Sequence, residues 1–303
     1  MLHLHFLRGL RRSLVSTTAL SACLLALSCH GQSSTQSQAE SAHIDSTTLR
    51  GDTLELIFAG DIMTHGPQIR AAAQSDGSYD FAQSFGLVRP AIERADLAIG
   101  NLETTFGGKP YSGYPMFSSP EALAVALREA GFDVLTTSNN HSCDRRGYGI
   151  THTIDVLDSL GIATTGSYRN LSERPARTPL IQSVRGIKLA ILAYTYGTNG
   201  LPIPHPTVID TISKEHIAAD LRRADSLGAE YKIVQIHWGN EYEKSPNRAQ
   251  RELAQWLADQ GVDAVIGSHP HVVQESTRLQ GQDTQRGETF VIYSMGNFIS
   301  NQI

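Results

Sequence analysis

Short apolar runs recur along the chain from residue 54 to residue 294, and segments of helical spacing lie between most of them. Runs of this length predict buried strands, and the intervening segments predict helices that pack on a sheet. The predicted strands cover residues 54–59, 97–102, 134–138, 180–184, 187–194, 231–237, 264–268 and 290–294. The predicted helices cover residues 85–95, 122–130, 148–160, 216–227 and 249–260. This order indicates an α/β domain with a mostly parallel or mixed sheet.

Turn and capping residues support several of these boundaries. Arg185-Gly186 separates two predicted strands and is typical of a two-residue hairpin. Ser119 followed by Pro120 is typical of a helix start, and a glycine at 131 or 161 is typical of a helix end.

Polar side chains stand just after the ends of the predicted strands: Asp61, Glu103, Asn140, His141, His237, His269 and His271. Ligand sites of α/β sheets lie outside the carboxyl ends of the strands, so we expect these residues to meet. Each alone has a simpler interpretation, because such residues are common in turns and most buried histidines are structural. Together they favour a metal site, where the extended His269-Pro270-His271 would present two imidazoles. Glu103 could bridge a metal pair of the kind that hydrolyses phosphoesters.

Six short motifs contain these residues: Gly60-Asp61, Gly100-Asn101-Leu102-Glu103, Ser138-Asn139-Asn140-His141, His237-Trp238-Gly239-Asn240-Glu241, Gly267-Ser268-His269-Pro270-His271-Val272 and Ser294-Met295-Gly296-Asn297-Phe298. Through these motifs, in this order across residues 54–301, the chain resembles the CapA-type poly-gamma-glutamate capsule synthesis proteins, which are relatives of the calcineurin-like metallophosphoesterases. The resemblance implies a four-layer αββα sandwich, a metallophosphatase-like site and a membrane-anchored role outside the cytoplasm.

The resemblance also implies roles for individual residues. Asp61 and His271 would hold one divalent metal ion. Asn140, His237 and His269 would hold a second one, with Glu103 as the bridge. His141 would stand beside the pair as the general acid for the leaving oxygen. Asn101, Glu241 and Asn297 would bind substrate or support the ligands, and this donor set suits Mn, Fe or Zn.

The chain departs from the family pattern in two places. The superfamily usually has Asp-x-His at the first strand, whereas this chain has Asp61-Ile62-Met63, with the nearest imidazole at His65. His65 could replace the absent imidazole or could be a turn residue. Family members usually continue past the Gly-Asn-Phe motif, whereas this chain stops at Ile303, so the second sheet is expected to lack its last strands.

The first 28 residues are typical of a secretory signal of the lipoprotein type. Three arginines precede an apolar stretch over residues 14–27, which is short for a membrane span. The triplets before Cys29 and Cys23 both resemble a lipobox. We expect lipidation at Cys29, with Cys23 as the alternative, or an ordinary signal peptide. Residues 29–51, rich in Ser, Gln and Thr, are expected to form a flexible tether to a domain over residues 52–303.

Charge and cysteine content narrow the choice of partners. The whole chain has a net charge of −5, and loss of the first 28 residues, with three arginines and no acid, leaves 22 basic against 30 acidic residues, a net charge of −8. Such an acidic body argues against nucleic-acid binding.

Cys143 would be the only thiol of the processed chain besides the lipidated cysteine, so no internal disulfide is expected. We do not expect it to be a nucleophile, because Asp144 adjoins it.

Three functions fit these features. The first is a metal-dependent hydrolase of phosphoester or related bonds. The second is a capsule or exopolymer assembly factor that binds an anionic polymer or a membrane synthase complex without turnover. The third is a solute-binding lipoprotein. In each case the chain would be exported and held at the bacterial membrane by an N-terminal lipid.

Overall fold

Two sheets form the centre of the protein in a computed structural model, which describes residues 1–7, 14–15, 53–283 and 287–302. The first sheet has the order β2 (Leu14–Val15), β1 (Leu2–Leu7), β3 (Thr53–Ile62), β4 (Leu97–Leu102), β5 (Val134–Thr136) and β6 (Ala163–Thr165), and β15 (Asn297–Ile299) pairs with β3. The second sheet has the order β13 (Ser276–Gln280), β14 (Glu288–Ile292), β12 (Ala264–Ser268), β11 (Tyr231–His237), β9 (Ile187–Thr195) and β8 (Leu180–Val184). A separate short ladder joins β7 (Ser167–Tyr168) to β10 (Val208–Ile209).

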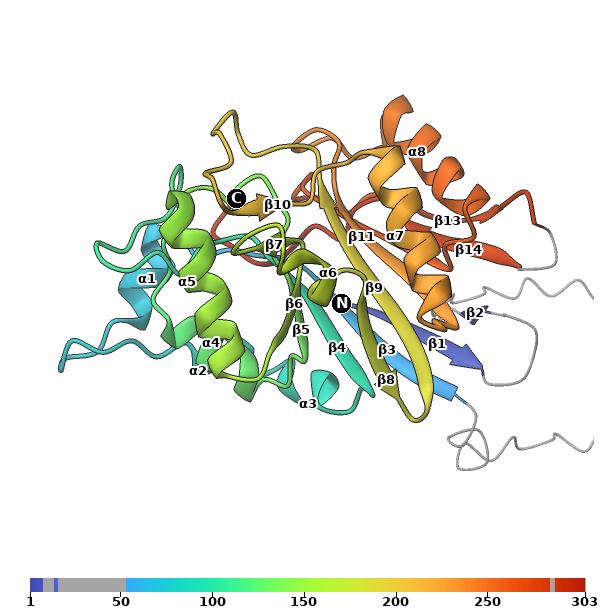
Figure 1. Cartoon of the computed structure of the whole chain (residues 1–303). Helices are drawn as coiled ribbons and strands as arrows, with labels where there is room; N and C mark the ends of the chain where they lie inside the picture. The colour runs from blue at the N-terminus through green and yellow to red at the C-terminus, as the bar shows by residue number, and fades with distance from the viewer. Residues whose placement is uncertain (8–13, 16–52, 284–286, 303) are drawn as a thin grey trace, which may run out of the picture.

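Helices cover the outer face of each sheet. The helices are α1 (Gly66–Ala72), α2 (Ala82–Phe85), α3 (Arg89–Ile92), α4 (Ala122–Glu129), α5 (Arg146–Ser159), α6 (Arg174–Arg177), α7 (Lys214–Ser226) and α8 (Arg248–Asp259). In Figure 1, α4 and α5 lie on one side of the strands and α7 and α8 on the other. This arrangement is the four-layer αββα sandwich that the family resemblance implied.

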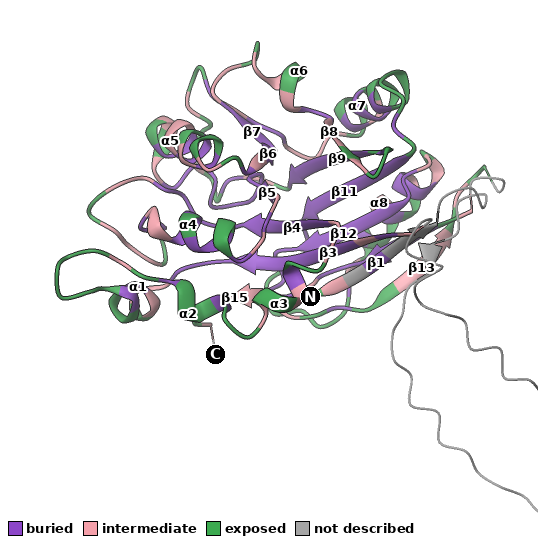
Figure 2. Ribbon diagram, turned by 90° about the horizontal axis from the view of Figure 1, so that it is seen from below, coloured by how far each residue is buried: buried purple, intermediate pink, exposed green. Residues whose placement is uncertain are grey.

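The alternation of side chains along the strands builds three apolar layers. Leu54, Leu56 and Phe58 of β3 pack between the sheets, whereas Ile57 and Ala59 pack under the helices of the first sheet. In the second sheet β9 alternates in the same way between the inter-sheet layer and the layer under α7 and α8. Figure 2 shows these central strands buried and the helices exposed on their outer faces. Full burial of each such side chain contributes about 1.5–3 kcal/mol, so the sandwich is a rigid base for its strand ends.

Most predicted elements are found within a few residues of their expected bounds. The predicted hairpin joins β8 to β9, with Arg185 at φ 50° and Gly186 at φ 79°, as a two-residue turn with both φ angles positive requires. The predicted helix over 85–95 is wrong, because the chain forms α2 and then α3. Pro90 accounts for the break, since it has no N–H to donate to Gly86 in a continuous helix.

The predicted cap of α4 is also wrong. Glu121 takes the N-cap position, and no side chain caps this end by a hydrogen bond. The hydroxyl of Ser119 instead lies 2.7 Å from the hydroxyl of Thr104 and contacts that of Thr64. Ser119 therefore ties the loop before α4 to the segments that follow β3 and β4.

The N-terminal segment adds β1 to the first sheet, between β2 and β3. β1 pairs antiparallel with β3 over residues 2–7, and Leu4 is fully buried between the sheets. These residues belong to the predicted leader, so this pairing describes the unprocessed chain. Cys23, Cys29 and the predicted tether lie outside the described residues. Within those residues, no helix is both long and apolar enough to cross a bilayer.

Two backbone contacts hold the strand ends close together. The amide of Asp61 donates to the carbonyl oxygen of Gly296 at 3.0 Å, and that of Met295 donates to Gly267 at 3.0 Å. A methyl group at Gly60 would overlap the Gly296 carbonyl oxygen. Glycine is therefore required at Gly60 by close backbone approach, which places β3 beside the turn after β14.

Candidate metal centre

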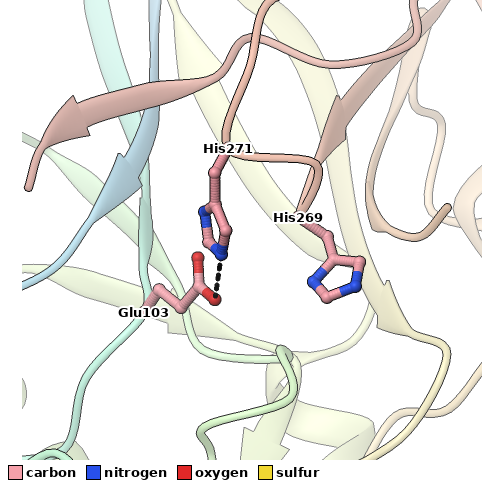
Figure 3. A group of neighbouring side chains, drawn as sticks. All are labelled: Glu103, His269 and His271. Carbon is pink, nitrogen blue, oxygen red and sulfur yellow. Dashed lines mark ion pairs between the residues drawn. The ribbon is translucent and has the colours of Figure 1, made fainter. Parts of the chain in front are cut away.

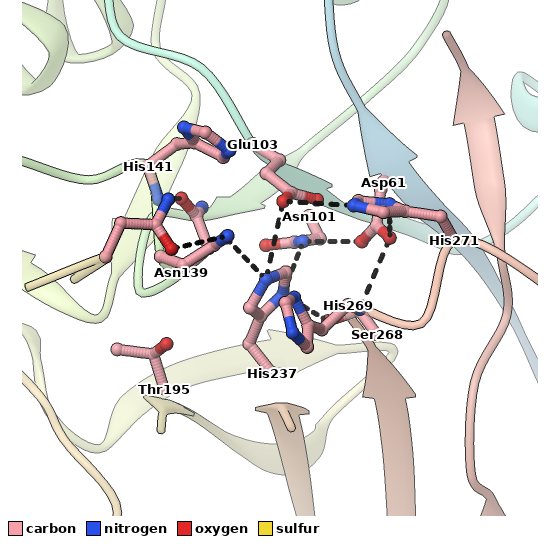
Figure 4. Close-up of polar contacts among 12 residues, drawn as sticks. Asp61, Asn101, Glu103, Asn139, His141, Thr195, His237, Ser268, His269 and His271 are labelled. Carbon is pink, nitrogen blue, oxygen red and sulfur yellow. Dashed lines mark hydrogen bonds and ion pairs between the residues drawn. The ribbon is translucent and has the colours of Figure 1, made fainter. Parts of the chain in front are cut away.

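Residues from both sheets meet at the carboxyl ends of the strands. The first sheet supplies Asp61 at the end of β3, Glu103 after β4 and Asn140 after β5. The second sheet supplies His237 at the end of β11, and His269 and His271 after β12. All six predicted ligands are buried, as is His141, and Figure 4 shows most of them around one centre.

Glu103 lies at the middle of this group. Its Oε1 atom is 3.4 Å from His237 Nε2 and 3.9 Å from His271 Nε2. Glu103 belongs to both sets of side chains whose ligand atoms lie within 4.8 Å of one another, one with His269 and His271 (Figure 3) and one with Asp61 and His237. These sets divide the ligands differently from the predicted pairing of Asp61 with His271, but they share Glu103, which was the predicted bridge.

Hydrogen bonds fix the orientation of Asp61. Its Oδ1 accepts from Asn101 Nδ2 at 2.8 Å, and its Oδ2 accepts from the backbone amide of His269 at 3.3 Å. Oδ2 also lies 3.2 Å from His271 Nδ1. Asp61 is thus connected to the second sheet through His269 and His271, and to Asn101 within the first sheet.

His237 is held from both sides of its ring. Its Nδ1 lies 2.9 Å from the hydroxyl of Ser268 and 3.3 Å from Asn101 Nδ2. Its Nε2 lies 2.8 Å from Asn140 Oδ1. The Asn140 segment is shaped by Asn139, whose side-chain amide donates to the Leu102 carbonyl at 2.7 Å.

The His269-Pro270-His271 turn has an unusual backbone. His269 has φ 95° and His271 has φ 59°, a region that non-glycine residues rarely occupy and that costs about 1–3 kcal/mol per residue. The turn is held by the amide of Tyr242, which donates to the Pro270 carbonyl at 2.8 Å. His271 Nδ1 lies 3.0 Å from Asn297 Oδ1, so Asn297 orients the His271 ring. Nδ1 of His271 faces two oxygen acceptors, one on Asp61 and one on Asn297, so this nitrogen carries the hydrogen. Nε2 faces Glu103 and has a free lone pair.

Burial and neighbouring charges shift the pKa values of the group. Burial, with Asp61 beside it, raises the pKa of Glu103 well above its usual value. Burial and neighbouring imidazoles lower the pKa of His237 well below its usual value and that of His269 to about 4. Burial alone would lower the pKa of His271, but the hydrogen bond and charge of Asp61 raise it. The imidazoles of His237 and His269 are therefore neutral near neutral pH, as metal ligation requires.

The donor atoms of this group fit divalent cations. Both carboxylate oxygens of Glu103 and the Nδ1 of His269 are buried and have no hydrogen-bond partner among the described residues. A buried polar group without a partner costs about 1–3 kcal/mol and requires an explanation. Carboxylate, imidazole and amide oxygen donors together suit borderline cations such as Zn, Mn or Fe.

His141 stands beside this group and is oriented by a carboxylate. Its Nδ1 lies 2.8 Å from Asp144 Oδ2, which also accepts the backbone amide of Phe117 at 2.6 Å. The edge of the Phe117 ring packs against the imidazole, with 4.7 Å between the ring centroids. Nδ1 therefore carries a hydrogen and donates it in a hydrogen bond to Asp144. Nε2 is then the ring nitrogen available for proton exchange.

The remaining predicted residues lie at the margin of the group. Glu241 is exposed, and its negative charge contributes to the raised pKa of Glu103 without a direct contact. Met63 is buried with its amide bonded to Ile299. His65 is at the start of α1, where its Nδ1 accepts the Asn301 amide at 3.2 Å. Cys143 is buried in an apolar cluster, and burial raises its pKa to about 11, as expected for an inert thiol.

Several contacting residues were not predicted. Asp144 and Ser268 are adjacent to predicted motif residues, and this proximity was the available signal. Tyr196 and Asn199 lie on the loop after β9, where Asn199-Gly200 is typical of an ordinary turn. The ring of Tyr196 packs on that of His269 with 4.6 Å between centroids. Tyr242 packs on His271 at 6.1 Å.

Comparison with known proteins gives a family match. The sequence profile of the family described as "Bacterial capsule synthesis protein PGA_cap" matches residues 55–302. The PGA biosynthesis protein CapA of Bacillus subtilis is 29% identical over 271 residues, which cover 84% of this chain and 65% of the relative. The capsule biosynthesis protein CapA of Bacillus anthracis is 28% identical over 268 residues, which cover 83% of this chain and 61% of the relative. The chain thus spans less than two thirds of the length of these relatives.

Among solved structures, the NAD nucleotidase of Haemophilus influenzae is similar with a TM-score of 0.47 and 14% identity, over 70% of this chain and 38% of that one.

Proposed function

The chain belongs to the PGA_cap family of bacterial capsule synthesis proteins, and we propose that it supports assembly or export of an exopolymer of the poly-gamma-glutamate type through a two-metal hydrolytic centre. We also propose that the protein is exported and anchored to the cell membrane by a lipid on Cys29, or on Cys23. Its expected partners are the membrane, a polymer synthase complex and the anionic polymer. The family match supports the biological role, and the buried ligand group supports the chemistry.

One observation carries the chemical part of the proposal. Glu103 is fully buried among histidines from the opposite sheet, and neither of its oxygens accepts a hydrogen bond within the described part of the chain. A carboxylate in this setting is costly unless a cation compensates it. Asp61, Glu103, Asn140, His237, His269 and His271 would hold two divalent ions, with Glu103 shared between them. Such a pair would supply Lewis acidity and would lower the pKa of a water molecule bound to it.

The residues of the chain would perform the remaining tasks. Asn101 and Asn297 hold Asp61 and His271 in place, so the donor atoms are preorganised before any substrate binds. The candidate ligand side chains are buried where the strand ends of the two sheets meet. His141 would donate a proton from Nε2 to the leaving oxygen, because Asp144 fixes the ring through Nδ1.

A metal analysis with a turnover assay tests this proposal. We would measure Mn, Fe and Zn by elemental mass spectrometry in wild-type chain, in the double variant His269→Ala/His271→Ala and in the control His216→Ala. His216 is an exposed residue of α7 remote from the centre, so its loss should leave metal content unchanged. The same samples would be assayed for hydrolysis of bis-p-nitrophenyl phosphate.

The outcomes separate the parts of the proposal. Two metals per wild-type chain, lost with turnover in the double variant, would support the hydrolytic centre. Metal without turnover of bis-p-nitrophenyl phosphate would leave the assembly role and reject phosphodiester hydrolysis. Absence of metal from folded wild type after reconstitution would reject the metal centre. Loss of acyl labelling in Cys29→Ser, compared with Cys23→Ser, would identify the lipidated residue, and no labelling of wild type would reject the anchor.

A further inference from the structure

The side-chain amide of Asn140 can bind a metal only in one of its two orientations. Its Oδ1 atom is an acceptor and can be a ligand, whereas its Nδ2 atom carries two hydrogens and cannot. In the structure Oδ1 points to the ligand group, 2.8 Å from His237 Nε2. Rotation of the amide by half a turn would present N–H groups to the same place. Whatever bonds to Nδ2 therefore influences whether Asn140 can bind a metal.

Asn199 bonds to that Nδ2 atom. The Asn140 amide donates to Asn199 Oδ1 at 3.2 Å. The same oxygen accepts from the hydroxyl of Tyr196 at 3.3 Å. Two donors thus converge on Asn199 Oδ1, and a carbonyl oxygen has two lone pairs to receive them.

The loop that carries Asn199 is built to place this oxygen. Asn199 has φ 51° and Gly200 has φ 74°, and asparagine tolerates this left-handed region better than most residues. The Leu201 amide donates to the Thr198 carbonyl at 2.9 Å, and the Thr198 hydroxyl donates to the Leu201 carbonyl at 2.6 Å, which closes the turn. The ring of Tyr196 packs on His269, so the loop is fixed against the centre at a second point.

We propose that Asn199 is a positioning residue that holds Asn140 in its metal-binding orientation by accepting a hydrogen bond from its amide. This inference rests on the proposed metal centre. It assigns a role in metal binding to a residue that has no direct contact with the other predicted ligands. Partners of this kind typically change metal affinity about 10–100-fold.

Two substitutions separate the hydrogen bond from the backbone conformation. Asn199→Gly keeps the freedom to adopt a positive φ but removes the acceptor. Asn199→Asp keeps an acceptor at the same position. A carboxylate has no N–H group, so it could not donate a hydrogen bond to Asn140 in the rotated orientation. Tyr196→Phe keeps the ring on His269 but removes the second donor. Thermal unfolding of each variant would check that the fold is retained.

The measurement is a titration of the purified 303-residue chain with Co²⁺, followed by calorimetry and by the d–d absorption of the bound ion. We expect Asn199→Gly to bind one of its Co²⁺ ions about 10–100-fold more weakly, with an altered absorption band. We expect Asn199→Asp to bind at least as tightly as wild type, and Tyr196→Phe to fall between wild type and Asn199→Gly.

Two results would overturn the inference while the metal centre stands. One is wild-type Co²⁺ affinity and absorption in Asn199→Gly. The other is an equal loss in Asn199→Gly and Asn199→Asp, because the acceptor would then be irrelevant. A wild-type chain that binds no Co²⁺ would reject the metal centre itself, and this inference with it.

Discussion

Arg174 lies between two buried carboxylates, those of Asp210 and Asp220. Its Nε donates to Asp210 at 2.6 Å, and its two terminal nitrogens donate to Asp220 at 3.1 and 2.6 Å. Tyr168 donates to Asp210 and Tyr194 to Asp220, at 2.6 and 2.8 Å. The Arg174 side chain is 19% exposed, and those of the two aspartates 7% and 6%. This cluster connects α6, β7, α7 and β9.

We predict that Arg174→Met is strongly destabilising. Methionine keeps much of the apolar stem but leaves two carboxylates without their cation. Removal of one partner from a buried ion pair costs about 3–5 kcal/mol, because the uncompensated charge stays buried. For a domain of this size, about 1 kcal/mol corresponds to about 2–4 °C, so the melting temperature should fall by roughly 6–20 °C.

The loss should depend on pH with a defined sign. Burial raises the pKa of Asp210 in the wild type, although Arg174 opposes this, and removal of Arg174 should raise it further. A carboxyl with a raised folded-state pKa binds more protons when folded than when unfolded. Its contribution to stability therefore increases as pH falls from above the folded-state pKa toward the unfolded value of about 3.9. The deficit of Arg174→Met relative to wild type should shrink over that interval.

Unfolding followed by circular dichroism, by heat and by urea at several pH values, would measure both effects. Arg89→Met is the matched control, because Arg89 pairs with Glu93 at 2.7 Å on the surface, with 52% and 46% of the two side chains exposed. That pair should contribute about 0.3–0.5 kcal/mol. A loss below about 1 kcal/mol in Arg174→Met, or a deficit that does not change with pH, would refute the reasoning.

Two further predictions concern packing near the centre. Gly60→Ala should destabilise the fold by about 3 kcal/mol or more in urea unfolding, because the added methyl overlaps the Gly296 carbonyl oxygen. Gly197→Ala, which meets no atom within 4 Å, is its control, and an equal effect of both would contradict the steric argument. Cys143 should resist iodoacetamide in the folded chain and react in denaturant, as its buried thiol has a pKa of about 11. Peptide mass spectrometry would check this, and rapid alkylation of the folded protein would contradict it.

The central strands could be predicted because their apolar runs are long enough to identify. β3, β4, β9 and β11 each bury nearly every residue, so apolar residues make up most of their sequences. β7 and β13 were missed because one is two residues long and the other, at a sheet edge, is polar and mostly half-exposed. Strand identity thus follows from burial, and edge strands carry less of that signal.

The sequence singled out the candidate ligands and two of their neighbours, Asn101 and Asn297, but not Ser268 or Asn199, which bond to His237 and Asn140. Asp61, His237 and His271 stand at strand ends within short motifs, and the structure brings them together. Asn199 gave no such signal, since an Asn-Gly pair after a strand is typical of a turn whatever it contacts. Its bond to Asn140 spans 59 residues of sequence, and only the packing of β9 beside the first sheet creates it.

The contact of Gly60 with Gly296 shows that the motifs contain two kinds of residue: some are required by packing, and others would be required by metal binding. These glycines are required by the space between two strand ends, and they would be required equally in a chain that had lost its metal ligands. The ligand positions, in contrast, could change without disturbing that contact. In related sequences, glycines at these positions would therefore indicate common ancestry and a common fold. Only the carboxylates and imidazoles would indicate a metal site. A relative that kept these glycines but lost the carboxylates and imidazoles would have the same fold and a different function.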